Sequence, residues 1–440
     1  MFLSSLPTID STVWVAIVLL NSIFLVYLTL RWRSGGGMTI DIFYVLKLLY
    51  LPVFMIPFAY SELNINSTGD KYYEYIDFIP QAVGVLVVGI VGTIMGAILG
   101  LSLRIKPLGL RCIQESLRGF WFKLFGINFL SALSIVVSFS LIILGFTPGA
   151  ARADAFQRPD LRFVYNAYTV LISFSTLLVL SFAYVRRSMR YFFIGFLLII
   201  LGFVSGTRAT SIGPLISLIA FYAITTKTRR LLPILLGGVI VSIGLVWVVG
   251  FRDGVYDLSY VARAPELLLF GNTLSDFRDF AWILSGWDGK LLAGSTYISG
   301  FLSFIPSAFL PLRTETSWAY FSLKYSGLGV EAIDFHPGLR PIIFGELYFN
   351  FGIVGVFVGG VVLGFTLTQL ARLLDDVPSN DAQRRPGVVL ASIIYVEYCL
   401  LQFFNTSGFF TFYVICGLMF LGLVLQSAKR RRRSYSFTRP

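Results

Sequence analysis

Charged residues, histidine and cysteine are scarce in this chain. Only 13% of its 440 residues are charged while 56% are hydrophobic, and the mean hydropathy is +0.79. No soluble globular class has this composition, so the sequence predicts a polytopic membrane protein. The three cysteines, Cys112, Cys399 and Cys416, are scattered along the chain. They form neither a disulfide framework nor a cluster of metal ligands, and redox chemistry is not expected.

Metal-dependent chemistry also lacks the residues that it needs. There is one histidine, His336, and no pair of aspartates separated by a single residue. These absences argue against a zinc site and against a metal-dependent sugar-nucleotide site, so we expect neither a metal nor a cofactor. The net charge of +12 does not indicate nucleic-acid binding, because the basic residues form short clusters beside apolar segments, as topology determinants do.

Eleven apolar segments are predicted to cross a membrane, which takes about 20 residues each. Two of them, 191–205 and 209–225, are short and meet at a tight turn. The other nine are 12–30, 40–61, 80–103, 120–146, 163–185, 231–250, 341–370, 387–405 and 408–427. We therefore expect an all-α fold with transmembrane helices 1–8 in residues 1–250, an extramembrane loop over 251–340, helices 9–11 in 341–428 and a basic tail over 429–440.

Basic residues are unevenly distributed between the two sides of this topology. One side carries Arg31 and Arg33, the cluster 104–118, Arg186 to Arg190, the cluster 227–230, the cluster 372–385 and the tail. The excess of Lys and Arg predicts that this side, with the C-terminus, is cytoplasmic. The N-terminus and the loop 251–340 then face outward. The first apolar segment has no basic residues before it, so we expect a first span rather than a cleaved signal peptide.

The outward loop is not a polar ectodomain. Phe277, Phe280, Ala281 and Leu284 recur at helical spacing after a plausible N-cap, Ser275, which predicts an amphipathic helix. Such helices lie in the membrane interface with their apolar faces in lipid. The loop is therefore expected to hug the membrane and to border a cavity that lipids can enter.

Arginines that the charge bias would exclude are concentrated on the outward side. Arg208, Arg252, Arg278 and Arg340 lie at span boundaries or in the expected interfacial helix. Burying one arginine at the bilayer centre costs about 2.5–3.5 kcal/mol, whereas one unit charge pair at about 4 Å contributes roughly 4 kcal/mol at an effective dielectric of about 20. Arginine is matched to phosphate oxygens, so the cluster predicts binding of a diphosphate. Pairing with local acids, as between Arg278 and Asp279, is the alternative for each one.

The ninth expected span carries the second group of candidate residues. Glu346 lies about one turn inside it, where an acid must be paired or line a wet cavity. It is interpreted either as an ion-pair partner of Arg340 or Arg208, or as a ligand for a substrate hydroxyl. His336, just before the span, is a candidate general base or a plain loop residue. A stripe of small residues follows and predicts close helix packing: Gly352, Gly355, Gly359, Gly360 and Gly364.

Three motifs together resemble those of a known family. They are the turn Ser205-Gly206-Thr207-Arg208-Ala209, the loop runs Phe277-Arg278-Asp279-Phe280, Gly294-Ser295-Thr296-Tyr297 and Phe304-Ile305-Pro306, and the run from Gly345 to Gly352. Over residues 190–365 this order and spacing is similar to that of the Wzy-type O-antigen polymerases, which polymerise oligosaccharide repeat units. The first 190 residues resemble the family only in hydropathy.

The resemblance implies a GT-C-like, metal-independent glycosyltransferase of the bacterial inner membrane. It would join undecaprenyl-diphosphate-linked repeat units at the periplasmic face, with membrane lipids around it and a chain-length regulator and a flippase as candidate partners. Arg208, Arg278 and Arg340 would bind diphosphate, and His336 or a loop acid would deprotonate the acceptor hydroxyl. The remaining substrate contacts would be Arg252, Arg313, Asp279, Tyr297, Glu346, Tyr348 and Asn350.

Two other functions share parts of this pattern. An O-antigen ligase also uses lipid-diphosphate donors and has a long outward loop, but the motif from Glu346 to Gly352 and the runs Thr296-Tyr297 and Phe304-Ile305-Pro306 favour the polymerase. A transporter or flippase of the same lipid-linked sugar is the non-enzymatic alternative. Transporters usually show two related halves and broken helices at the midplane, and the sequence shows no duplication.

Overall fold

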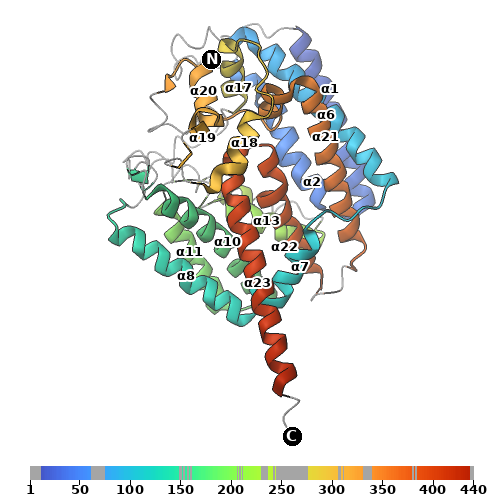
Figure 1. The fold of residues 1–440 in the computed structure, drawn as a ribbon. Coiled ribbons are helices and arrows are strands. Elements are labelled where there is room, and N and C mark those ends of the chain that lie inside the picture. Colours follow the sequence, from blue (N-terminus) through green and yellow to red (C-terminus); the bar gives the residue numbers. More distant parts are fainter. Residues whose placement is uncertain are drawn as a thin grey trace. The chain divides into compact units, whose positions relative to one another are not determined.

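The computed structural model describes residues 11–60, 75–147, 161–205, 212–228, 276–305, 312–330, 339–378 and 384–436, with some isolated residues between these ranges. Throughout this part of the chain the regular structure is helical, with no strand (Figure 1). The chain divides into two compact units. Unit 1 comprises Met1–Ile105, Arg263–Leu373 and Leu400–Phe409, and unit 2 comprises Lys106–Ala262, Leu374–Cys399 and Phe410–Pro440.

Within the described residues, eight helical stretches are long and apolar enough to span a membrane, as a multi-pass membrane protein requires. They are Ser11–Gly35, Ile40–Pro57, Ile76–Ser102, Leu124–Ile143, Arg162–Arg186, Gly345–Asp375, Arg384–Phe403 and Thr406–Ala428. Each coincides with an apolar segment predicted from the sequence. The two short segments form the helices Met189–Phe203 and Gly213–Thr226. The segment predicted at 231–250 falls largely outside the described residues.

Unit 1 contains four of these stretches and the helices of the loop. Its elements are α1 (Ser11–Gly35), α2 (Ile40–Val45), η1 (Leu46–Tyr50), α3 (Leu51–Ala59), η2 (Ile76–Phe78), α6 (Ile79–Ser102), α17 (Asp276–Gly286), α18 (Ser295–Phe301), η4 (Leu302–Phe304), α19 (Leu312–Glu315), α20 (Trp318–Tyr325), most of α21 (Gly345–Asp375), η7 (Leu401–Phe403) and η8 (Thr406–Gly408).

Helices α6 and α21 pack in parallel with their backbones in contact. A Cβ added at Gly96 would lie 2.0 Å from the carbonyl oxygen of Val361, and one added at Gly364 would lie 1.9 Å from that of Thr93. Only glycine allows this approach, which gives the dispersion contacts that hold helices together where water supplies no driving force. The packing predicted for the glycine stripe is confirmed at Gly360 and Gly364, which both face α6.

Gly352 has a different role from the rest of the stripe. Its backbone adopts φ 64° and ψ −159° inside α21, a conformation that is available to glycine and strained for other residues. The helix is therefore broken one residue after Phe351. The carbonyl oxygens of Phe349 and Asn350, which precede the break, accept the N–H groups of Leu292 and Ala293 over 2.9 and 3.1 Å. The loop before α18 thus satisfies backbone groups that the break leaves without helical partners.

The expected helix of the outward loop is present, but its surroundings differ from the prediction. α17 is buried from Phe277 to Leu284 and contacts α3, η2, α6 and α20. The prediction that its apolar face lies in lipid is therefore wrong. The polar residues Arg278 and Asp279 are buried with the apolar ones because they pair with each other, and Ser275 lies outside the described residues.

Unit 2 is built around α10 (Arg162–Arg186), the most buried of the candidate spans among the described residues, which packs against α8 (Leu124–Ile143), α11 (Met189–Phe203) and α13 (Gly213–Thr226) (Figure 1). Its other elements are α7 (Leu110–Ser116), η3 (Leu117–Trp121), α22 (Arg384–Tyr395), η6 (Val396–Leu400) and all but the first residue of α23 (Phe409–Ser436). The hydroxyls of Ser134 on α8 and Ser175 on α10 lie 2.6 Å apart and join the two helices within the apolar core.

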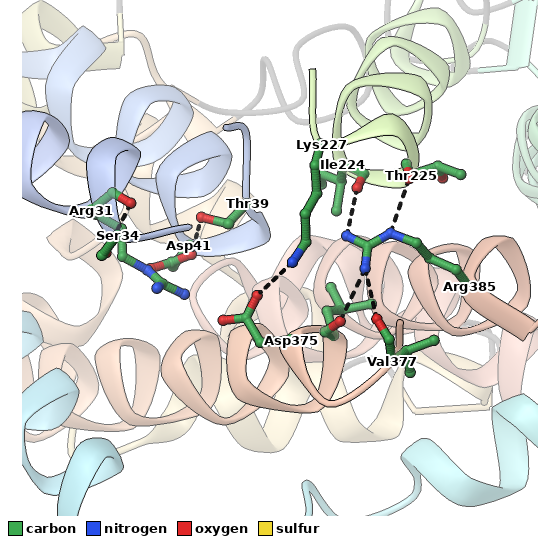
Figure 2. Close-up of polar contacts among 11 residues, drawn as sticks. Arg31, Ser34, Thr39, Asp41, Ile224, Thr225, Lys227, Asp375, Val377 and Arg385 are labelled. Atoms are coloured by element: carbon green, nitrogen blue, oxygen red, sulfur yellow. Dashed lines mark hydrogen bonds and ion pairs between the residues drawn. The ribbon is translucent and has the colours of Figure 1, made fainter. Parts of the chain in front are cut away.

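A buried arginine closes two helix ends in unit 2. Arg385 is 2% exposed, and its guanidinium donates to the carbonyl oxygens of Ile224 and Thr225, at the end of α13, and to those of Leu374 and Val377, around the end of α21 (Figure 2). The last four carbonyls of a helix have no helical partner. Arg385 donates to three such carbonyls, those of Ile224, Thr225 and Leu374, and to that of Val377 just beyond the end of α21.

Candidate functional site

The candidate site of unit 1 centres on a buried carboxylate in the first turn of α21. Glu346 is 0% exposed. Its Oε1 accepts the hydroxyls of Thr296, over 2.7 Å, and of Thr406, and its Oε2 accepts the backbone N–H of Thr406 over 2.9 Å. Three donors from α18 and η8 thus converge on one carboxylate, and no arginine is among its partners in the described part of the chain. Of the two interpretations made from sequence, the structure does not support the ion pair with Arg340.

Asn350 extends this cluster by one helical turn. Its Nδ2 donates to Thr296 Oγ1 over 2.9 Å and to the carbonyl oxygen of Glu346 over 2.8 Å. Because Thr296 Oγ1 and the Glu346 carbonyl oxygen both act as acceptors, they fix the orientation of the Asn350 amide. Its Oδ1 therefore points away from these two atoms. Asn350 is 1% exposed, and its Oδ1 is buried without a hydrogen-bond partner among the described residues. An unpaired buried acceptor costs free energy and calls for a functional explanation.

Two tyrosines flank this cluster. Tyr348 is half-buried and its hydroxyl accepts Nε2 of Gln81 over 3.0 Å. The hydroxyl of Tyr297 donates to the carbonyl oxygen of Phe403 over 2.9 Å, and burial raises the pKa of Tyr297, with the Glu346 carboxylate adding to the effect. Tyr297 is therefore a hydrogen-bond donor at working pH. Each tyrosine keeps part of its surface accessible, as a contact for sugar or lipid headgroup would require.

The buried ion pair of α17 lies near the same end of α21. Nε and Nη2 of Arg278 both donate to Asp279 Oδ1, over 3.1 and 2.8 Å. The local pairing considered from sequence is confirmed. Phe280, the next residue, makes an edge contact with the ring of Tyr348 at a centroid separation of 6.3 Å. The pair thus lies on a helix that packs against the start of α21.

Arg313 binds backbone carbonyls. Its Nη1 donates to the carbonyl oxygens of Ser303 and Ile305 over 2.8 and 2.6 Å, and more weakly to that of Leu302. Burial lowers the pKa of Arg313. The guanidinium therefore fixes the turn that follows η4, in the run Phe304-Ile305-Pro306. Its contribution to substrate binding, predicted from sequence, would have to come from its remaining N–H groups.

Arg340 is the exposed arginine of this region. The residue before it is held on both sides, because the Leu339 N–H donates to Ser322 Oγ over 3.1 Å and its carbonyl oxygen accepts Nε1 of Trp318 over 2.9 Å. Arg340 itself is exposed and makes no ion pair with a described residue. A fixed backbone that presents an uncompensated guanidinium is suited to an anionic ligand.

The turn that carries Arg208 belongs to unit 2. Its flanking residues are well anchored: Tyr165 donates to the carbonyl oxygen of Ser205 over 2.8 Å, Ser205 Oγ accepts the Thr207 N–H over 3.1 Å, and the hydroxyls of Thr207 and Thr210 lie 2.6 Å apart. This explains the Ser and Thr residues of the motif. Arg208 itself lies outside the described residues, as do Arg252 and His336.

Sequence reasoning missed the two threonines that hold Glu346. Thr296 precedes Tyr297 in a motif that was recognised, but only the tyrosine was predicted to act. Thr406 gave no signal, because it lies in the turn between the last two spans, far from the loop in sequence. Its position after Asn405, whose side chain accepts the Ser407 N–H, is typical of a capped turn.

Comparisons with protein-family models, with curated proteins and with solved structures find no significant match to this chain. Among the described residues, no group of three or more His, Cys, Asp or Glu side chains is arranged to hold a metal ion.

Proposed function

We propose that this protein polymerises undecaprenyl-diphosphate-linked oligosaccharide repeat units, of O-antigen or a related surface polysaccharide, at the periplasmic face of the bacterial inner membrane. On this proposal the fold is a GT-C-like arrangement of about eleven transmembrane helices. The observation that carries the proposal is the contact between Thr296 and Glu346. It joins two of the family-like motifs, which are 50 residues apart, in one buried polar cluster.

The polar cluster supports a site for sugar hydroxyls. Carboxylate, amide and tyrosine groups at the start of α21 provide several fixed donors and acceptors in an otherwise apolar protein. Asn350 Oδ1 is the acceptor that is left to a ligand. A buried acceptor of this kind selects a hydroxyl strongly, because an analogue lacking the hydroxyl leaves it unpaired.

The diphosphate would be bound by arginines. Arg340 is the best supported of these, since it is exposed and its backbone is fixed. Arg278 would reach a phosphate through Nη1 or the second N–H of Nη2, because Asp279 accepts the N–H of Nε and one N–H of Nη2. Arg208 is retained on the resemblance of its turn to the family signature.

The reaction requires one bond to form and one to break. The acceptor hydroxyl oxygen attacks the anomeric carbon of the donor glycan, whose bond to the diphosphate oxygen breaks. The hydroxyl proton passes to His336 or to a loop acid, and the diphosphate leaves with the bond's electron pair. Guanidinium groups that are already in place stabilise this developing negative charge without reorganising.

A synthetic undecaprenyl-diphosphate repeat unit tests the proposal. The purified protein in detergent, with a chelator present, should convert the matching repeat unit into a ladder of products on a gel. Arg208→Lys should abolish most of the ladder although it keeps the charge, because the bidentate geometry is lost. Arg340→Ala should weaken it. Arg118→Ala, which removes an exposed arginine from η3, is the matched control and should leave the ladder unchanged.

The alternatives predict other products. Transfer to a lipid A core without a ladder would identify a ligase. Movement of the lipid-linked sugar across vesicles without a new glycosidic bond would identify a transporter, which the broken helix at Gly352 would favour. The break lies seven residues into α21, about 10 Å along the helix, and so nearer its start than its middle. Wild-type ladders in both Arg208→Lys and Arg340→Ala would rule out the proposed site.

A further inference from the structure

A half-open groove lies within unit 1, away from the polar cluster. Its empty space is about 480 Å³ when the part open to the surroundings is included, and it is lined by residues of α1, α2, η1, α6 and α21, nearly all of them apolar. The lining residues used below are Ile23, Tyr27, Asp41, Ala97 and Thr368. The helices that form it are four of the candidate membrane spans. Two of its apolar lining residues, Ile23 and Ile94, are 43% and 39% exposed, so an apolar surface borders the opening of the groove.

The groove has one polar end. Asp41, at the start of α2, is 5% exposed and accepts the hydroxyls of Tyr27 and Thr39 and Nε of Arg31, over 3.0, 2.5 and 2.7 Å. Figure 2 shows Arg31, Thr39 and Asp41 at the turn between α1 and α2. The polar end therefore coincides with the C-terminal end of α1.

Basic residues lie at or just beyond the C-terminal ends of three helices that line the groove. Arg31 and Arg33 lie in the last turns of α1, Arg104 follows α6, and Arg372 lies one turn beyond Thr368 on α21. Arg33 and Arg104 are exposed. Arg372 donates to the carbonyl oxygens of Gly100, Leu101 and Leu103. The charge bias assigns this side to the cytoplasm, where anionic lipids attract Lys and Arg.

We propose that the groove binds one acyl chain of an anionic phospholipid, whose phosphate contacts the basic residues at the groove's polar end. Lipid chains are as apolar as the lining residues, so the groove alone would select no lipid. The arginines supply the preference for an anionic headgroup. From Ile90 to Ala97 on α6 the groove is about 10 Å long, which accommodates part of an extended chain. This site lies at the opposite end of α21 from Glu346 and does not depend on the proposed polymerase activity.

Photolabelling tests the site directly. The full chain is placed in phosphatidylcholine nanodiscs that contain a minor fraction of phosphatidylglycerol with a diazirine in one acyl chain, and labelled peptides are identified by mass spectrometry. We expect labels on α1, α6 and α21 at the groove. Ala97→Phe fills the groove and should reduce them about tenfold, a difference of about 1.4 kcal/mol. Ile98→Phe, at a neighbouring position that is 52% exposed and outside the groove, should leave them unchanged.

A second variant tests the proposal independently, in case Ala97→Phe misfolds. Arg33→Gln combined with Arg104→Gln leaves the groove intact and should still reduce labelling by the phosphatidylglycerol probe. Equal labelling of Ala97→Phe and Ile98→Phe would overturn the proposal. Equally strong labelling by a phosphatidylcholine probe with the same diazirine chain would also overturn it, because the site would then have no preference for an anionic headgroup.

Discussion

Thr296 Oγ1 donates a hydrogen bond to Glu346 Oε1 over 2.7 Å, across 50 residues of sequence. This contact fastens α18 to the first turn of α21. Thr406 approaches the same carboxyl group from η8, so three segments meet at one buried side chain. These hydrogen bonds define the geometry around Asn350, whose Oδ1 has no hydrogen-bond partner among the described residues.

Replacing the carboxylate should loosen this meeting point. In Glu346→Gln, the amide has one oxygen in place of two, and its NH2 group faces a donor. One donor then loses its partner in a fully buried site, which costs about 1–3 kcal/mol. We expect a lower thermal midpoint in detergent, with loss of any ladder activity. Glu315→Gln, at an exposed position, is the control. An unchanged midpoint in Glu346→Gln would contradict the central role of this carboxylate.

A side chain at Gly352, where α21 is broken, should destabilise the protein. A Cβ at Gly352 would have space, with Leu291 no nearer than 3.8 Å, so the effect of Gly352→Ala isolates backbone strain. At φ 64° and ψ −159° we expect a cost of about 1–3 kcal/mol. Gly84→Ala, in the interior of α6 with nothing near its added Cβ, should instead stabilise the protein by about 0.5–1 kcal/mol. Thermal unfolding of the two variants should therefore shift in opposite directions.

The helices were predictable because hydropathy and length decide them locally. Eight spans follow from apolar runs, and α17 follows from the spacing of Phe277 and Phe280. The burial of α17 could not be predicted, because two adjacent charged residues in a sequence usually indicate a solvent-exposed position. In the structure Arg278 and Asp279 form an ion pair, which allows both to be buried. The glycine stripe predicted packing correctly at Gly364, yet nothing in the sequence distinguishes Gly364 from Gly352, where the conformation differs.

The sequence identified Glu346 as a site residue but did not identify the residues that hydrogen-bond to it. An acid one turn inside a span must be satisfied, which identified Glu346. An arginine or a substrate hydroxyl was the expected partner, because charge is the signal that a sequence shows. The observed partners are threonines, which are common and carry no signal of pairing, and one of them comes from a turn 60 residues away. Only the folded chain brings these donors together.

The loop that stabilises the helix break should respond to acid. The Lys290 N–H donates to Asp288 over 3.0 Å, and this bond lowers the pKa of the Asp288 carboxyl. A depressed folded-state pKa contributes stability that is present above the unfolded value of about 3.9 and is lost as the pH falls through the folded value. The Leu292 and Ala293 amides, which bind α21, should then exchange faster relative to their intrinsic rates. Hydrogen exchange of Asp288→Asn should lack this step, and a step that persists in the variant would assign it to another group.

Arg385 should be irreplaceable by lysine. Its guanidinium divides its donors between carbonyls around the ends of α13 and α21, with four contacts of 2.9 to 3.2 Å. A lysine keeps the charge but has a compact ammonium with three donors, which cannot reach acceptors spread around a planar fork. At least one buried carbonyl would lose a hydrogen bond to a charged group, worth about 1.5–3 kcal/mol. Arg385→Lys should therefore unfold at a lower temperature, whereas Arg384→Lys, at the neighbouring exposed position, should match the wild type. Equal midpoints for the two variants would mean that α13 and α21 end stably without this arginine.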